Sequence, residues 1–207
     1  MDALDTTQLM AIAAAMGWAS GIRLYAVVFL TGLAGSLGWV TLPPGLALLQ
    51  SPVMLSVSGV MLAAEFFADK VPGLDSVWDT VHTVLRIPAG AALAAGVFGG
   101  DHQTWAMAAA LAGGTLAATS HVAKATTRAA VNTSPEPFSN LGLSLLGDAA
   151  VPGLLWLAWS EPAWFFAVLA VSVVVALALT VVLFRFLRGL VRRVRSWLLP
   201  QPLGSSG

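Results

Sequence analysis

The sequence predicts an all-α membrane protein with about six transmembrane helices, arranged as two inverted three-helix repeats and followed by a C-terminal basic amphipathic helix. Three observations support this prediction. The composition is too apolar for a water-soluble domain, apolar stretches long enough to cross a bilayer recur along the chain, and two segments of the chain resemble each other. We therefore expect lipid to surround most of the molecule.

The composition is the first of these observations. Apolar residues make up 57% of the 207 residues and charged residues only 10%, against about a quarter in soluble domains. So few charges cannot cover a surface in contact with water. The formal net charge is zero, which gives no reason to expect a nucleic-acid partner. The absence of cysteine excludes disulfides, thiolate metal sites and cysteine nucleophiles.

Apolar stretches of membrane-spanning length are the second observation. A bilayer core about 30 Å thick is crossed by roughly 20 apolar residues in a helix. Six stretches approach this length, at about 7–35, 51–68, 82–99, 103–124, 137–158 and 162–185. The first contains Gly17, Gly21 and Arg23, so we expect it to be kinked, tilted or partly re-entrant. Backbone groups in lipid must be hydrogen-bonded within the segment, which favours helices.

Lysine and arginine gather on one predicted side of the membrane. With six spans, both termini and the second and fourth loops share a side. That side holds Lys70, Arg86, Lys124, Arg128 and the arginines that follow Phe184. The loops near 35–50, 100–103 and 160–162 hold neither residue type. Because Lys and Arg are enriched in cytoplasmic loops, we expect both termini on the cytoplasmic side of a bacterial inner membrane.

The residues after Phe184 predict a separate basic helix. The arginines that recur there at helical spacing are Arg185, Arg188, Arg192 and Arg195. A basic amphipathic helix lies on an anionic membrane surface, so we expect anionic lipid as the partner of residues 186–200. A stop-transfer tail is the simpler interpretation, and a regulatory or protein-binding role is the other. We expect residues 201–207 to be a flexible tail with the composition of a linker.

The internal repeat is the third observation. Residues 51–65 and 134–148 align without a gap, with serine, proline, serine, glycine, leucine and a carboxylate at the same spacing. Repeats of three spans each would place the second repeat upside down relative to the first, because three is odd. We therefore expect one repeat at 1–100 and the other at 101–185. Chance matches in so apolar a chain are the alternative.

Three charged residues stand out within the predicted spans, namely Arg23, Glu65 and Asp148. The repeat adds Arg128, just beyond the fourth span, as the counterpart of Arg23. A charge at this depth is costly and faces a cavity or a partner. Inversion brings Arg23 to the depth of Asp148 and Arg128 to that of Glu65, so we expect two symmetry-related ion pairs. Such pairs either lock the helices together or line a substrate path.

Polar residues also mark predicted helix ends. Ser51 and Ser134 suit the N-cap position, and the prolines that follow them suit the first helical position. Ordinary capping explains both serines. The functional alternative is that these serines, together with Asn132, supply polar contacts to a solute at the helix ends.

An acidic cluster follows the second predicted span. It consists of Asp69, Asp75, Asp79 and His82. The last three share one helical face, and carboxylates with an imidazole suit a divalent cation, so the cluster is a candidate metal site. Solvated, ion-paired loop charges are the simplest interpretation of the same residues. His102 and His121 lack acidic neighbours at ligand spacing, and we leave them out of the site.

Three longer stretches carry a family resemblance. They are GWASGIRLY at 17–25, EFFADKVPGLDSVWDTVH at 65–82, and the segment from Lys124 to Asn140 that ends in VNTSPEPFSN. Through them the sequence resembles the domain of unknown function 4126 family of bacterial inner-membrane proteins, over about residues 10–185. The resemblance implies a multi-pass membrane protein and no particular activity. The pattern before Arg128 departs slightly from the Ala-Gly-Thr-Arg that we expect, but it keeps the arginine.

The leading functional prediction is a transporter or channel for an ion or a small polar solute. The repeats would rock against each other or leave a pore between them, and the intramembrane charges would line or lock the path. One alternative is a metal-dependent membrane enzyme acting on a lipid-linked phosphate. Another is a non-catalytic membrane scaffold. A homo-oligomer is compatible with all three.

Overall fold

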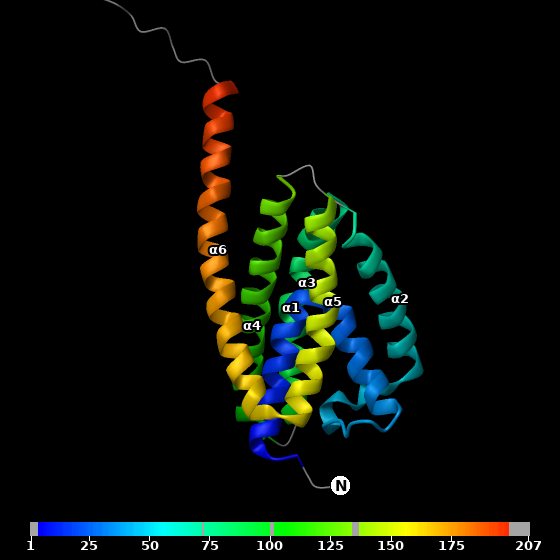
Figure 1. Ribbon diagram of the computed structural model, residues 1–207. Helices are drawn as coiled ribbons and strands as arrows, with labels where there is room; N and C mark the ends of the chain where they lie inside the picture. The colour runs from blue at the N-terminus through cyan, green and yellow to red at the C-terminus, as the bar shows by residue number, and fades with distance from the viewer. Residues whose placement is uncertain (1–3, 72, 100–101, 134–136, 199–207) are drawn as a thin grey trace, which may run out of the picture.

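A computed structural model describes residues 4–71, 73–99, 102–133 and 137–198, and within them the chain is helical throughout (Figure 1). The elements are α1 (Thr6–Ser36), the 3-10 helix η1 (Pro44–Gln50), α2 (Pro52–Ala68), α3 (Leu74–Phe98), α4 (Gln103–Val131), α5 (Pro137–Ser160) and α6 (Pro162–Leu198). Ser134 and the predicted tail at 201–207 lie outside the described residues.

The prediction of an all-helical chain with about six apolar stretches of membrane-spanning length is confirmed. Five helices are long and apolar enough to cross a membrane, and a sixth span is counted if η1 and α2, which meet at 69°, form one bent span. Each predicted stretch corresponds to one of α1 to α6. The main difference lies at α3, which begins at Leu74 rather than near residue 82. The acidic cluster therefore belongs largely to a helix.

Local sequence sets where the helices begin. Asp5 caps α1 in a capping box, in which its Oδ1 accepts from the Gln8 backbone N–H at 2.7 Å and the Gln8 side chain accepts from the Asp5 backbone N–H. Ser51 Oγ accepts from the Met54 backbone N–H at 3.3 Å, so this serine is the N-cap of α2. Gly73, with a φ of 86°, makes the tight turn into α3.

α1 turns back on itself at Arg23. The backbone there is non-helical, with φ −147° and ψ 88°. Met16 and Thr31, which lie 15 residues apart, approach to 4.0 Å between Sδ and Oγ1. A straight helix would separate them by about 22 Å. α1 is therefore a helical hairpin with Arg23 at its tip, and Figure 1 shows its two blue halves descending from the middle of the bundle toward the same end.

The hairpin changes the path of the chain through the bundle. The N-terminal end of α1 lies beside the α5–α6 turn, where Gln8 Nε2 is 3.5 Å from the carbonyl oxygen of Trp159. The C-terminal end of α6 lies at the opposite end of the bundle (Figure 1). The prediction that both termini share one side counted the first apolar stretch as a full crossing. In the structure this stretch enters and leaves by one end of the bundle, so the described ends of the chain lie at opposite ends.

Small residues hold the first half of the hairpin against α3 and α4. A Cβ added to Gly17 would lie 2.5 Å from Gly113 Cα on α4, and a Cβ on Gly113 would collide with Ala94 on α3. Packing through small residues is typical of helices in membranes, where close backbone approach replaces the hydrophobic effect. These contacts fix the height at which the hairpin tip, Arg23, stands among the other helices.

α6 is one continuous helix of 37 residues, which corresponds to a length of about 55 Å. It extends past the other helices in Figure 1. The segment that we expected to form a separate basic helix is in the structure the C-terminal continuation of the last span. Its arginines are exposed. This length exceeds the hydrocarbon core of a bilayer, about 30 Å thick, so the arginine-bearing part would stand outside the core.

Candidate functional site

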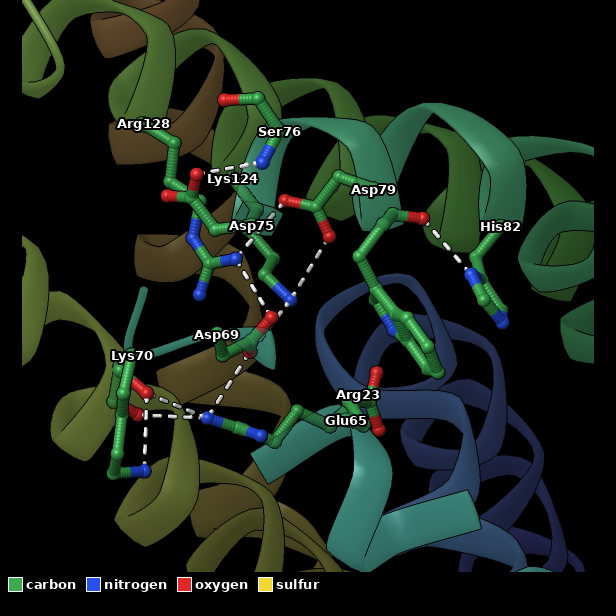
Figure 2. A network of polar contacts seen from close by, with 12 residues as sticks. Arg23, Glu65, Asp69, Lys70, Asp75, Ser76, Asp79, His82, Lys124 and Arg128 are labelled. Carbon is green, nitrogen blue, oxygen red and sulfur yellow. Dashed lines mark hydrogen bonds and ion pairs between the residues drawn. The ribbon is translucent and has the colours of Figure 1, made fainter. Parts of the chain in front are cut away.

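The charged side chains of the bundle gather into one buried network. Its cations are Arg23, Lys70, Arg86, Lys124 and Arg128, and the carboxylates paired with them are Glu65, Asp69, Asp79 and Asp148. Asp75 is the fifth carboxylate, and its negative charge acts on Arg128. The cations include every lysine and arginine that precedes Arg185. The formal charges cancel, which allows so many ionised groups to be buried among apolar helices. Figure 2 shows most of the network from close by.

Arg23 reaches from the hairpin tip to two carboxylates. Its Nη2 lies 2.9 Å from Asp148 Oδ1 on α5 and 3.1 Å from Asp69 Oδ2, which directly follows α2. The same nitrogen donates to Ser144 Oγ at 3.0 Å. Lys70 Nζ contacts the other oxygen of Asp148 at 3.2 Å. The structure thus places Arg23 against Asp148, as the repeat predicts, and adds partners that the repeat does not supply.

Asp69 and Asp79 share two cations of α4. Arg128 Nη1 lies 2.7 Å from Asp69 Oδ1 and 3.3 Å from Asp79 Oδ2. Lys124 Nζ lies 3.2 Å from Asp69 Oδ2 and 3.3 Å from Asp79 Oδ1. The predicted pair of Arg128 with Glu65 is therefore wrong. The physical reason is that the α2–α3 connection brings Asp69, one turn beyond Glu65, to Arg128.

Asp69 stands at the centre of the network, between Arg23 on one side and Lys124 and Arg128 on the other (Figure 2). Burial alone would raise the pKa of this carboxyl. The hydrogen bond from Arg128 and the positive charges of Lys124, Arg128 and Arg23 outweigh burial and hold the pKa of Asp69 well below its ordinary value. Asp69 is therefore ionised throughout the physiological pH range.

Glu65 pairs with Arg86 of α3, and both side chains are completely buried. Arg86 Nη2 lies 2.7 Å from Glu65 Oε1, and Arg86 Nη1 lies 2.7 Å from Asp79 Oδ1. His121 joins this group, with Nδ1 3.3 Å from Arg86 Nη1 and Nε2 2.7 Å from Thr83 Oγ1. Sequence reasoning missed Arg86 and His121. Arg86 stood at the edge of the predicted third span, whereas the earlier start of α3 places it mid-helix.

Asp75 has a structural role at the start of α3. Its Oδ1 accepts from the backbone N–H groups of Gly73 at 2.9 Å and Ser76 at 2.6 Å. Asn132 Nδ2, at the end of α4, donates to the same oxygen at 3.1 Å. Asn132 therefore ties the end of α4 to the start of α3. Ser51 is remote from this group, because it caps the opposite end of α2.

The four residues of the candidate metal site have separate interactions in the structure. Asp69 and Asp79 face cations, and Asp75 accepts from two backbone N–H groups at the start of α3. His82 stacks on the Trp78 ring with 4.1 Å between ring centroids, and its Nδ1 lies 2.8 Å from the Trp78 carbonyl oxygen. Within the described part of the chain, no three His, Asp or Glu side chains are grouped as a metal ion would require.

Two cavities adjoin the hairpin. One of about 310 Å³ lies between the hairpin tip, α4, α5 and α6, and its charged lining consists of Arg23, Asp69, Lys124 and Arg128. The other, of about 580 Å³, lies near the opposite end of the bundle. Its lining, which includes Leu30 and Trp159, bears no charged side chain. Only the first cavity reaches the charge network.

Long apolar helices, packing through small residues and a balanced charge network buried within the bundle together define a multi-pass membrane protein. The family named Domain of unknown function (DUF4126) matches residues 10–182, so the chain belongs to that family, as the sequence resemblance implies. No curated protein matches the chain. No solved structure matches it either.

Proposed function

We propose that the protein is a transporter or channel for an ion or a small polar solute. The observation that carries the proposal is the charge network at the tip of the α1 hairpin. Non-helical backbone at membrane depth is tolerated where it is buried in protein or lines a cavity, and charged residues at that depth mark substrate pathways. Arg23 combines both features, since it breaks the helix and carries a charge.

Shared partners make the network suitable for exchange. Asp69 lies within 3.2 Å of cations from the hairpin and from α4. A solute that displaces one of these cations leaves Asp69 paired with the others, so a carboxylate is not stranded in the bundle. If the hairpin tip moved relative to α4, Asp69 would likewise keep some of its cation partners while it lost others. α2 and α5, which carry most of the two aligned segments, run in opposite directions in Figure 1, as inversion of these segments requires.

The distribution of basic residues supports one orientation. Lys70, which follows α2, Arg128, in the last turn of α4, and the arginines of α6 lie toward the same end of the bundle (Figure 1). By the positive-inside rule this end faces the cytoplasm of a bacterial inner membrane. The C-terminal end of α6 is then cytoplasmic, and the N-terminal end of α1 lies on the opposite side. The arginines of α6 would meet anionic lipid at the cytoplasmic surface.

Flux into proteoliposomes tests the proposal. Purified protein is reconstituted and assayed with chloride, phosphate, potassium and protons as separate probes. We expect flux of at least one probe above that of protein-free vesicles. The paired change Arg23→Gln with Asp148→Asn keeps the charge balance and should abolish that flux. Arg185→Gln, on the exposed part of α6, is the matched control and should leave it unchanged.

The scaffold alternative predicts a different result. Folded protein that gives no flux of any probe above protein-free vesicles would overturn the transport proposal. Flux that is equal in wild type and in the paired variant would show that the solute does not pass the charge network. Elution as a single species in size-exclusion chromatography establishes that each variant is folded.

A further inference from the structure

We propose that the cavity beside Arg23 binds an anionic amphiphile, whose phosphate or carboxylate head meets Arg23 and Arg128 and whose hydrocarbon chain lies along α5 and α6. As a statement about the solute that is moved, this rests on the function proposed above. As a statement about binding, it stands on the cavity alone. The volume of about 310 Å³ is at the lower end of ligand sites, which span about 300–1,000 Å³.

The polar end of the cavity offers unused hydrogen-bond donors. Arg23 is 1% exposed, and its Nε and Nη1 have no hydrogen-bond partner among the described residues. Arg128 is 2% exposed, and its Nε is likewise without a partner there. Buried N–H groups of a guanidinium without acceptors are costly, and an anionic oxygen would satisfy them. Both arginines line the cavity.

The position of Gly147 on α5 shows where Arg23 is reached from the cavity. A Cβ built on this glycine would lie 3.6 Å from Arg23 Nε. Gly147 also lines the cavity. Because glycine has no side chain, α5 places no side chain against the unpartnered Nε. The head group would share the guanidinium groups with Asp69 and Asp148, which already share Arg23.

The remainder of the cavity is apolar and opens sideways. Leu143 and Leu154 of α5 form part of the wall, and Val175 and Leu179 of α6 form another part. Val175 is 49% exposed and Leu179 43% exposed on the outer surface of the bundle. In a membrane that surface faces lipid. A ligand with a hydrocarbon chain could therefore enter from the bilayer, with its chain between α5 and α6 and its head toward Arg23.

Binding of radiolabelled dodecyl phosphate to the protein in phosphatidylcholine nanodiscs tests the proposal. We expect saturable binding that unlabelled dodecyl phosphate displaces. Dodecanol, which has the chain without the charge, and inorganic phosphate, which has the charge without the chain, should fail to displace it at the same concentration. Displacement by inorganic phosphate would show a simple anion site, and displacement by dodecanol would show general lipid contact. Either result overturns the proposal.

Glycine substitutions on α5 supply a matched set of variants. Gly147→Leu fills the cavity beside Arg23 without removing a charge, and its Cβ makes only ordinary contacts. It should weaken binding by about tenfold or more, because a charge-assisted contact is lost. Gly142→Leu and Gly153→Leu point into open space on the same helix and should bind as wild type does. Equal binding by all three variants would place the ligand elsewhere.

The outcomes for binding and transport are separable. Dodecyl phosphate binding that Gly147→Leu abolishes, in a protein that gives no flux of any probe, would leave this site standing and refute transport. Flux of a small solute with no dodecyl phosphate binding would leave transport standing and refute this site. Arg23→Lys adds a check that keeps the charge. It should weaken binding, because a lysine cannot present the guanidinium fork.

Discussion

Removal of Arg86 is the sharpest test of the buried network. Arg86 contacts Glu65 and Asp79 at 2.7 Å each, and neither Arg86 nor Glu65 is exposed. In Arg86→Met, Asp79 keeps its contacts with Lys124 and Arg128. Glu65 keeps no cation, and its Oε2 already lacks a hydrogen-bond partner among the described residues. The loss of stability in Arg86→Met should therefore come mainly from the unpaired Glu65 carboxylate.

The magnitude follows from what a stranded buried charge costs. Breaking a buried ion pair by removing one partner destabilises a protein by about 3–5 kcal/mol. Arg86→Met should lower the free energy of unfolding by that amount. Glu65→Leu in the same chain removes the stranded carboxylate, so the double variant should recover about 1–3 kcal/mol relative to the sum of the two single losses.

The assay is unfolding of the purified protein by SDS in mixed micelles, followed by tryptophan fluorescence. A control cycle uses Glu161→Leu, directly before α6, and Arg185→Leu on α6. Both positions are exposed and about 36 Å apart along the helix direction, so their effects should simply add. Additive losses in the Arg86 and Glu65 cycle, within about 0.5 kcal/mol, would refute the reasoning, because the two groups would then be independently solvated.

Three further predictions concern the packing of α1, the pH dependence of stability and the role of Asp75. Gly17→Leu should unfold the bundle at lower SDS than wild type because it collides with Gly113, whereas Gly189→Leu on α6 meets open space and should be neutral; equal midpoints would contradict the close packing of α1. The depressed pKa of Asp69 means that its stabilisation is complete above the ordinary value of 3.8 and is lost as the pH falls below it, so the stability difference between wild type and Asp69→Asn should be constant above that pH and shrink below it. Asp75→Ala should lower the free energy of unfolding by about 1–3 kcal/mol, equally with and without a chelator, because Gly73, Ser76 and Asn132 lose their acceptor; a loss that depends on divalent metal would support the metal hypothesis.

Composition and apolar length predict the helices well, because lipid demands both a minimum length and internal hydrogen bonding. They fail where a helix is locally polar. α3 begins with the acidic residues around Asp75 and Asp79. Their low hydropathy places them outside a predicted span, but in the structure both side chains are buried and have partners on α4. The glycines and Arg23 of the first apolar stretch predict that it is irregular. Its reversal depends on contacts with distant helices, such as Gly17 with Gly113, that local sequence does not contain.

The candidate site shows the same division. The rule that charges inside spans need partners predicts that Arg23, Glu65 and Asp148 are paired, and the repeat adds Arg128. Partner choice was harder to predict. Symmetry paired Arg23 with Asp148 and the structure places them together, but Arg128 and Glu65 find nearer partners in Asp69 and Arg86. Those partners are set by the position of the α2–α3 connection, which depends on tertiary packing.

Single-cysteine labelling in intact cells measures most directly whether α1 turns back at Arg23. The chain has no cysteine, so each introduced residue is the sole target. A membrane-impermeant maleimide should label Thr7→Cys and Ser36→Cys from the periplasmic side, and Val71→Cys and Ser196→Cys only after permeabilisation. Thr7→Cys that is labelled only together with Ser196→Cys would mean that α1 crosses the membrane, which would contradict the hairpin and remove Arg23 from its tip.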